Sequence, residues 1–445
     1  MKYVEVRLYN VRNINFACGS RGRRQASYSV YEREETLMKM KKVLAILLAL
    51  VLVFSLAACG NSGGGSSSGG SSGGGESAGG DTIKLGWLGA LTGDGAVWGT
   101  CESQTLEMLI EQKNAEGGLL GKQIELVKYD TQGKADEVPN VTTRLTSQDH
   151  VSAIIGPNSS GQAIAMTPIL TEAKTAGIAT VATGERVTVD NGTLNEYNFR
   201  VCFIDPYQGA VVGSYAYDKL GKRKAAVLYD QGSDYSEGFK QYFKEEFEKL
   251  GGEVVIEKAY SAGDQDFRVQ LTDIKNAGVD CMLMPVGSNG DIYTIVPQVA
   301  ELGLDDVTLL GGDTWQSEDV NKMSGPRLAG SYVCNHYDAS DPALKPLQDA
   351  YHEKYGADAT VEINAYMAHD AFLLWCAAVE AAGTEDPEAV AAQLTKVEVD
   401  GLTGHIKISE EDHNPVGKEA SIQTYEYDEA SGVNSEVFVE KYSPL

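Results

Sequence analysis

Short apolar segments alternate with amphipathic segments along the chain from Thr82 onward. Residues 83–88 are mainly apolar, as expected for a buried strand, whereas Leu106, Leu109 and Ile110 recur at helical spacing within 102–114. The same patterns predict further strands at 124–129, 151–155 and 178–181, and further helices at 138–147 and 168–176. Strands that alternate with helices at this spacing indicate a parallel sheet covered on both faces.

A second series of the same kind begins at residue 225. It predicts strands at 225–229, 254–258, 281–284 and 308–310, and helices at 236–250, 267–277 and 292–302. A long apolar helix at 364–382 follows, and the short alternating segments within 397–427 indicate a late hairpin that completes a lobe. The fold class is therefore α/β.

Two such series predict two Rossmann-like lobes with parallel sheets, joined by a hinge. We assign 82–203 plus 330–395 to the first lobe and 204–329 plus 396–445 to the second. Ligands of open α/β sheets bind beyond the carboxyl ends of the strands. We therefore expect the loops that follow these strands to face one cleft.

The N-terminal region has the pattern of a secretory signal. Three lysines, at 39, 41 and 42, precede an apolar run at 43–54, which is short for a membrane span. The following Leu-Ala-Ala-Cys resembles the bacterial lipobox, which implies a signal peptide at 38–58 and a diacylglycerol on Cys59. An uncleaved anchor with an incidental cysteine is the alternative, and both place the rest of the chain outside the cytoplasm. Residues 1–37 do not fit in front of a signal, so we expect an upstream extension and a translation start at Met38 or Met40.

Residues 59–81 form a linker of Gly and Ser that cannot bury a core and tethers the folded part to the membrane. The chain has 63 acidic and 37 basic residues, a formal net charge of −26. Basic residues outnumber acidic ones only in the segment up to Cys59, so the remainder is strongly acidic. An acidic body is repelled by nucleic acid and by anionic lipid, so we expect neither as a partner.

The chain contains no motif of a catalytic or cofactor site. It lacks a nucleophile elbow, and the glycine cluster at 117–122 has the wrong spacing for a phosphate-binding loop. Its six histidines are scattered without metal-ligand spacing, and the five cysteines after Cys59 form no paired motif, which favours buried thiols. We therefore expect no enzyme activity, no cofactor and no metal.

Five segments carry a resemblance to a known family. They are LGWLGALTG at 85–93, NAEGGLLGKQIEL at 114–126, AIIGPNSS at 153–160, DYSEG at 234–238 and VDGLTG at 399–404. Their order and spacing resemble the branched-chain amino acid receptors, which are type I periplasmic (solute-binding) proteins of ABC importers. The resemblance covers roughly residues 82–440 and implies an amino acid ligand, an ABC permease as partner, and a monomer.

The resemblance also implies the ligand-binding residues. The serine pair Ser159 and Ser160 is expected to hold the ligand carboxylate near a helix start, and Trp98 to cover the ligand. Tyr235 and Asp313 of the second lobe are expected to contact the ligand, with Asp313 pairing with its ammonium group. In the alternative interpretation, Ser160 and Asp313 only cap the helices that follow them.

Four further candidates depart from the family's aliphatic pocket. Thr183 replaces a missing hydroxyl, and Arg186 is expected to enter the pocket with Glu185. Ser288 and Asn289 stand where the receptors for leucine-like ligands carry aromatic residues. These changes leave polar or charged amino acids, amides and urea-like solutes open as ligands. Two other functions stay open beside transport: a ligand-sensing receptor domain of the same fold, and an extracellular enzyme.

Overall fold

The computed structural model describes residues 82–93, 95–338 and 340–444. These residues belong to one compact unit. The predicted extension at 1–37, the signal at 38–58, the lipidated Cys59 and the linker at 59–81 lie outside the described residues and stay predictions. Within the described part, no helix is long and apolar enough to span a membrane.

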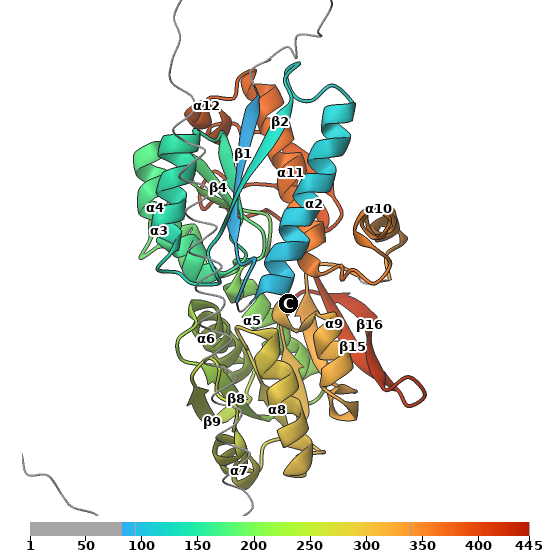
Figure 1. Ribbon diagram of the computed structural model, residues 1–445. Coiled ribbons are helices and arrows are strands. Elements are labelled where there is room, and N and C mark those ends of the chain that lie inside the picture. Colours follow the sequence, from blue (N-terminus) through green and yellow to red (C-terminus); the bar gives the residue numbers. More distant parts are fainter. Residues whose placement is uncertain (1–81, 94, 339, 445) are drawn as a thin grey trace, which may run out of the picture. The chain divides into compact units, whose positions relative to one another are not determined.

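The first lobe is built on a five-stranded parallel sheet in the order β2-β1-β3-β4-β7. The strands are β1 (Ile83–Gly89), β2 (Ile124–Asp130), β3 (Ala153–Ile155), β4 (Ala176–Ala179) and β7 (Asn198–Arg200). Figure 1 shows α2 (Ala96–Ala115), α3 (Val138–Arg144), α4 (Ser160–Ala173) and α11 (Ile363–Ala382) around this sheet. β1, β3 and β4 are buried along their whole length or nearly so, as expected for strands covered on both faces.

The second lobe is built on a seven-stranded mixed sheet in the order β16-β15-β12-β11-β10-β8-β9. Its parallel strands are β8 (Lys224–Asp230), β9 (Glu253–Tyr260), β10 (Cys281–Leu283), β11 (Thr308–Gly311) and β12 (Tyr332–Asn335). β15 (Ala420–Asp428) and β16 (Val433–Tyr442) add an antiparallel hairpin at one edge. The helices of this lobe are α5 (Asp205–Ser214), α6 (Asp234–Lys249), α7 (Arg268–Ala277), α8 (Asn289–Glu301) and α9 (Glu318–Met323).

Shorter elements complete the two lobes. They are α10 (Lys345–Tyr355), α12 (Pro387–Ala391), the strand pair β5 (Val189–Asp190) with β6 (Thr193–Leu194), and the hairpin β13 (Glu398–Gly401) with β14 (Gly404–Lys407). Helix α11 is apolar on most of its surface and lies in the core of the first lobe, where it packs against α2 and β13. The five described cysteines are buried free thiols, as the sequence predicted.

The predicted α/β fold with two lobes is confirmed, but two segments belong to the other lobe than the one to which we assigned them. β12, which we assigned to the first lobe, hydrogen-bonds beside β11, because its apolar side chains continue the second sheet. The hairpin β13-β14, which we assigned to the second lobe, packs against α11 and contributes Ile406 to the core of the first. The chain therefore crosses between the lobes three times, at 201–204, 336–344 and 408–419.

One helix also differs from its prediction. The helix expected at 168–176 is α4, which begins eight residues earlier and contains Pro168 in its interior. It ends where Lys174 adopts a left-handed conformation with φ of 51°. Ala176, which the prediction placed in the helix, is therefore the first residue of β4.

Candidate ligand-binding site

A cavity lies between the two lobes, and the unfilled space in and around it, open solvent included, is about 480 Å³. The residues that line it follow the carboxyl ends of strands or begin helices. From the first lobe these are Trp98, Asn158, Ser159, Ser160, Val181, Ile363 and Asn364. From the second lobe they are Ser233, Tyr235, Gly287, Asp313 and Thr314. The expectation that the loops after both sets of strands face one cleft is confirmed.

The first-lobe end of the cavity is a helix start. Ser159 has an extended backbone at the N-cap of α4, and its hydroxyl makes no capping hydrogen bond. The Ser160 hydroxyl accepts a hydrogen bond of 3.0 Å from the Gly184 N–H and so holds the loop after β4. Neither serine caps α4 through its side chain, so the free N–H groups of the first turn are left for an anion in the cavity.

The second-lobe end of the cavity carries a buried carboxylate. Asp313 is 3% exposed and accepts a hydrogen bond of 2.8 Å from the Tyr235 hydroxyl. His336 Nε2 lies 3.2 Å from the other carboxylate oxygen of Asp313. Burial lowers the pKa of His336, which favours a neutral ring that donates from Nε2. Asp313 makes no side-chain cap at the short helix Asp313–Trp315, so the capping interpretation is wrong.

The surroundings of the cavity are rich in buried acids that the sequence analysis missed. Asp205, Glu102 and Glu362 are buried, and burial raises the pKa of each carboxyl group to about 8. The Glu102 carboxylate accepts hydrogen bonds from Thr180 and from the cavity residue Asn158. Asp205 begins α5, Glu102 lies on α2 and Glu362 directly precedes α11, so no common sequence pattern marks them. Their burial depends on packing between segments far apart in the sequence.

Five of the nine predicted ligand-binding residues line the cavity: Trp98, Ser159, Ser160, Tyr235 and Asp313. Thr183 is buried behind it, in a loop that the Arg200 guanidinium holds through the carbonyl groups of Ala182 and Gly184. The sequence analysis missed the remaining cavity residues. They are Asn158, Val181, Ser233, Gly287, Thr314, Ile363 and Asn364.

The other three predicted residues lie outside this cavity. Arg186 is half-exposed and bonds to Asp190 and, across the cleft, to Asp234 at 3.1 Å. Ser288 caps α8 by accepting a hydrogen bond from the Gly290 N–H. Asn289 and Ser288 line a neighbouring hollow, on which Trp98 also borders.

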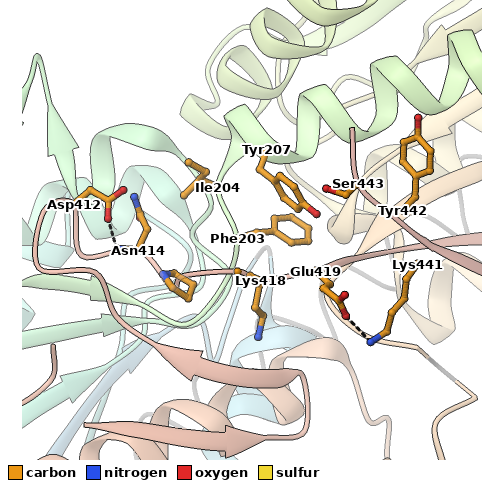
Figure 2. A pocket seen from close by; sticks show the side chains of 12 residues that line it. Phe203, Ile204, Tyr207, Asp412, Asn414, Lys418, Glu419, Lys441, Tyr442 and Ser443 are labelled. Carbon is orange, nitrogen blue, oxygen red and sulfur yellow. Dashed lines mark hydrogen bonds and ion pairs between the residues drawn. The ribbon is translucent and has the colours of Figure 1, made fainter. Parts of the chain in front are cut away.

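A larger hollow lies over two of the segments that cross between the lobes, 201–204 and 408–419. Figure 2 shows Phe203, Tyr207 and Lys418 at this hollow, with the Glu419–Lys441 ion pair of 2.7 Å at its rim. It includes none of the nine predicted residues. Among the described residues, no cluster of three or more His, Cys, Asp or Glu side chains could hold a metal ion.

Two α/β lobes, crossed three times by the chain and enclosing a cavity of mixed polar and apolar lining at the strand ends, define a solute-binding protein. Residues 82–428 match the family described as Periplasmic binding protein, and the chain belongs to this family. This is a family of solute-binding proteins rather than enzymes.

Relatives and solved structures agree with this assignment. The chain is 27% identical over 331 residues to the leucine-, isoleucine-, valine-, threonine- and alanine-binding protein of Pseudomonas aeruginosa. The aligned region covers 74% of this chain and 86% of that relative. A branched-chain amino acid transporter substrate-binding protein of Streptococcus pneumoniae, solved with isoleucine, is 30% identical with a TM-score of 0.72, covering 81% and 100%. A leucine-binding protein of Thermotoga maritima is 29% identical with a TM-score of 0.72, covering 81% and 99%.

Proposed function

We propose that this protein is the extracytoplasmic binding component of an ABC importer and that its ligand is an amino acid. The observation that carries the proposal is that one cavity has an anion-binding helix start on one side and a buried carboxylate on the other. The start of α4 with Ser159 lies on the first-lobe side, and the Asp313 carboxylate lies on the second-lobe side.

The first-lobe end suits a carboxylate. The N–H groups of the first turn of α4 and the positive end of its dipole favour an anion, and the Ser159 hydroxyl is not used for capping. The fixed loop at Gly184 keeps Ser160 in place when the ligand enters.

The second-lobe end suits an ammonium group. Asp313 is held in one orientation by Tyr235 and His336, and a buried carboxylate is strongly stabilised by a cation that reaches it. Because the two ends belong to different lobes, a ligand that carries both charges bridges the lobes and favours the closed arrangement. The name of the Pseudomonas relative lists leucine, isoleucine, valine, threonine and alanine as ligands, which supports an amino acid as the ligand of this protein.

The membrane attachment that we propose is a diacylglycerol on Cys59, supported by the lipobox-like sequence and the Gly/Ser tether behind it. The protein works as a monomer and delivers its ligand to an ABC permease. Its net charge of −26 makes nucleic acid an unsuitable partner.

The test is a thermal-shift screen of the purified protein against matched compounds: amino acids, the same carboxylic acids without the amine, and the same amines without the carboxylate. A ligand at a hundred times its dissociation constant adds about 2.7 kcal/mol of stability. We expect stabilisation only by compounds that carry both charged groups. Equal stabilisation by a carboxylic acid that lacks the amine would overturn the assignment.

A further inference from the structure

Asn364 is a cavity residue whose side-chain amide makes no hydrogen bond to the described part of the chain. It is the second residue of α11, is 1% exposed and lines the cavity between the lobes. Neither its amide oxygen nor its amide nitrogen has a hydrogen-bond partner among the described residues. A buried amide left without hydrogen bonds destabilises the protein, so its presence calls for an explanation.

Trp98 has the same property on the adjacent helix. Its indole Nε1 is buried and without a hydrogen-bond partner in the described part of the chain, and its side chain lines the same cavity. Helix α2, which carries Trp98, packs against α11, which carries Asn364. The first-lobe wall of the cavity therefore offers one indole donor together with an amide that both donates and accepts.

The proposed orientation of the ligand leaves this wall for its side chain. If the carboxylate lies at the start of α4 and the ammonium group at Asp313, both charged groups are bound by other residues. An aliphatic side chain would leave Asn364 and Trp98 unpaired, whereas a hydroxyl or an amide would give them partners. A site that is built to hydrogen-bond a polar group strongly disfavours the analogue that lacks it.

We infer that the ligand is an amino acid with a hydroxyl or amide side chain, such as threonine or asparagine, and that Asn364 recognises this group. The inference rests on the proposed function. It goes beyond it by favouring a hydroxyl or amide side chain over the leucine and isoleucine named for the two solved structures, whereas the name of the Pseudomonas relative includes threonine beside aliphatic amino acids. It also moves the specificity position from Arg186, Ser288 and Asn289, which the sequence favoured, to Asn364.

Two isosteric pairs test the inference by calorimetry with the full mature protein. Threonine and valine differ by a hydroxyl in place of a methyl group, and asparagine and leucine have nearly the same shape. We expect the polar member of at least one pair to bind about tenfold or more tightly than its apolar partner. Equal or tighter binding of valine and leucine would overturn the inference and leave the proposed function intact. Failure of every amino acid to bind would instead overturn the proposed function.

Two matched variants test which asparagine distinguishes polar from apolar ligands. In Asn364→Leu we expect the polar-to-apolar affinity ratio to fall to about one or to invert, because the wall then offers an apolar group. Asn289→Leu makes the same substitution at a buried asparagine that also lacks partners among the described residues but lines the neighbouring hollow. A ratio that changes in Asn289→Leu and not in Asn364→Leu would overturn the assignment. If Asn364→Leu does not fold, as judged by circular dichroism, Asn364→Ala replaces it, and the wild-type ratios stand independently of either variant.

Discussion

The two walls of the cavity differ in how far their polar groups are already paired. On the second-lobe wall, Asp313 is held by Tyr235 and His336 before any ligand arrives. On the first-lobe wall, the polar atoms of Asn364 and Trp98 have no partner among the described residues. A group held in place loses little freedom when it binds, whereas an unpaired group is satisfied only by a ligand of matching chemistry.

This contrast separates two tasks in the proposed site. The paired wall recognises a feature that all amino acids share, the ammonium group, and needs a fixed orientation for it. The first-lobe wall holds the shared carboxylate at the start of α4, and through Asn364 and Trp98 it contacts the part in which amino acids differ. Substitutions of Asp313 and of Asn364 are therefore expected to have different effects: a loss of all binding for Asp313 and a change of preference for Asn364.

The largest effect is expected for Asp313→Asn. The variant keeps the shape of the side chain near Tyr235 and His336 but removes the charge that we propose pairs with the ligand. A charge-assisted contact in a desolvated cleft typically contributes about 2–5 kcal/mol, so calorimetry should show about 30-fold or weaker binding for every amino acid ligand. Asp273→Asn is the control and should bind normally. Asp273 lies on α7 and forms an ion pair with Lys258 at the surface. Retained affinity in Asp313→Asn would show that the paired wall is only structural.

The sequence alone predicted part of each wall: Trp98, Ser159 and Ser160 on the first-lobe side and Tyr235 and Asp313 on the second-lobe side. Tyr235 and Asp313 were found because they follow strands of a regular α/β pattern and match a family motif. His336, which contacts Asp313 without lining the cavity, and the cavity residue Asn364 were missed because both come after β12, where the chain crosses back to the first lobe and no local pattern marks the crossing. Asn289 and Arg186 were predicted in the site because of their place after strands, but Asn289 lies in a neighbouring hollow and Arg186 at the edge of the cleft.

The strand order explains why the lobe boundaries were less predictable than the elements. Alternation of strands and helices is a local property, and most elements lie where the pattern predicted them. The membership of β12 in the second sheet depends on pairing with β11 and β15, and the hairpin β13-β14 joins the first lobe through its contacts with α11. These are contacts between distant segments.

A second prediction concerns a buried acid behind the first-lobe wall. Glu102 supports Asn158 of that wall, and burial raises the pKa of its carboxyl group to about 8. An unfolded glutamate loses its proton near pH 4.3, so between about pH 5 and 8 the folded state binds more protons than the unfolded state. Stability should therefore fall as pH rises through this window, by up to about 1.4 kcal/mol per pH unit from this group.

Chemical denaturation at several pH values checks this expectation. Glu102→Gln removes the titrating group, so its free energy of unfolding should fall less steeply between pH 5 and 8 than that of the wild type. The exposed Glu116, at the end of the same helix, provides the control variant Glu116→Gln, which should keep the wild-type slope. Identical slopes in all three proteins would mean that Glu102 is ionised in the folded protein.

The smallest effect is expected for Arg186→Ala, which tests whether the edge of the cleft shares in recognition. The Arg186 side chain is 53% exposed, and its ion pair with Asp234 joins the lobes outside the cavity. Exposed ion pairs contribute about 0–1 kcal/mol and are screened by salt, so we expect at most about fivefold weaker binding, smaller still at high ionic strength. The order of preference among ligands should not change, since this guanidinium does not line the cavity. Lys345→Ala, at another exposed ion pair, is the control. A change of the preferred amino acid in Arg186→Ala would mean that specificity is set at the edge of the cleft, and the contrast between the two walls would then not explain ligand choice.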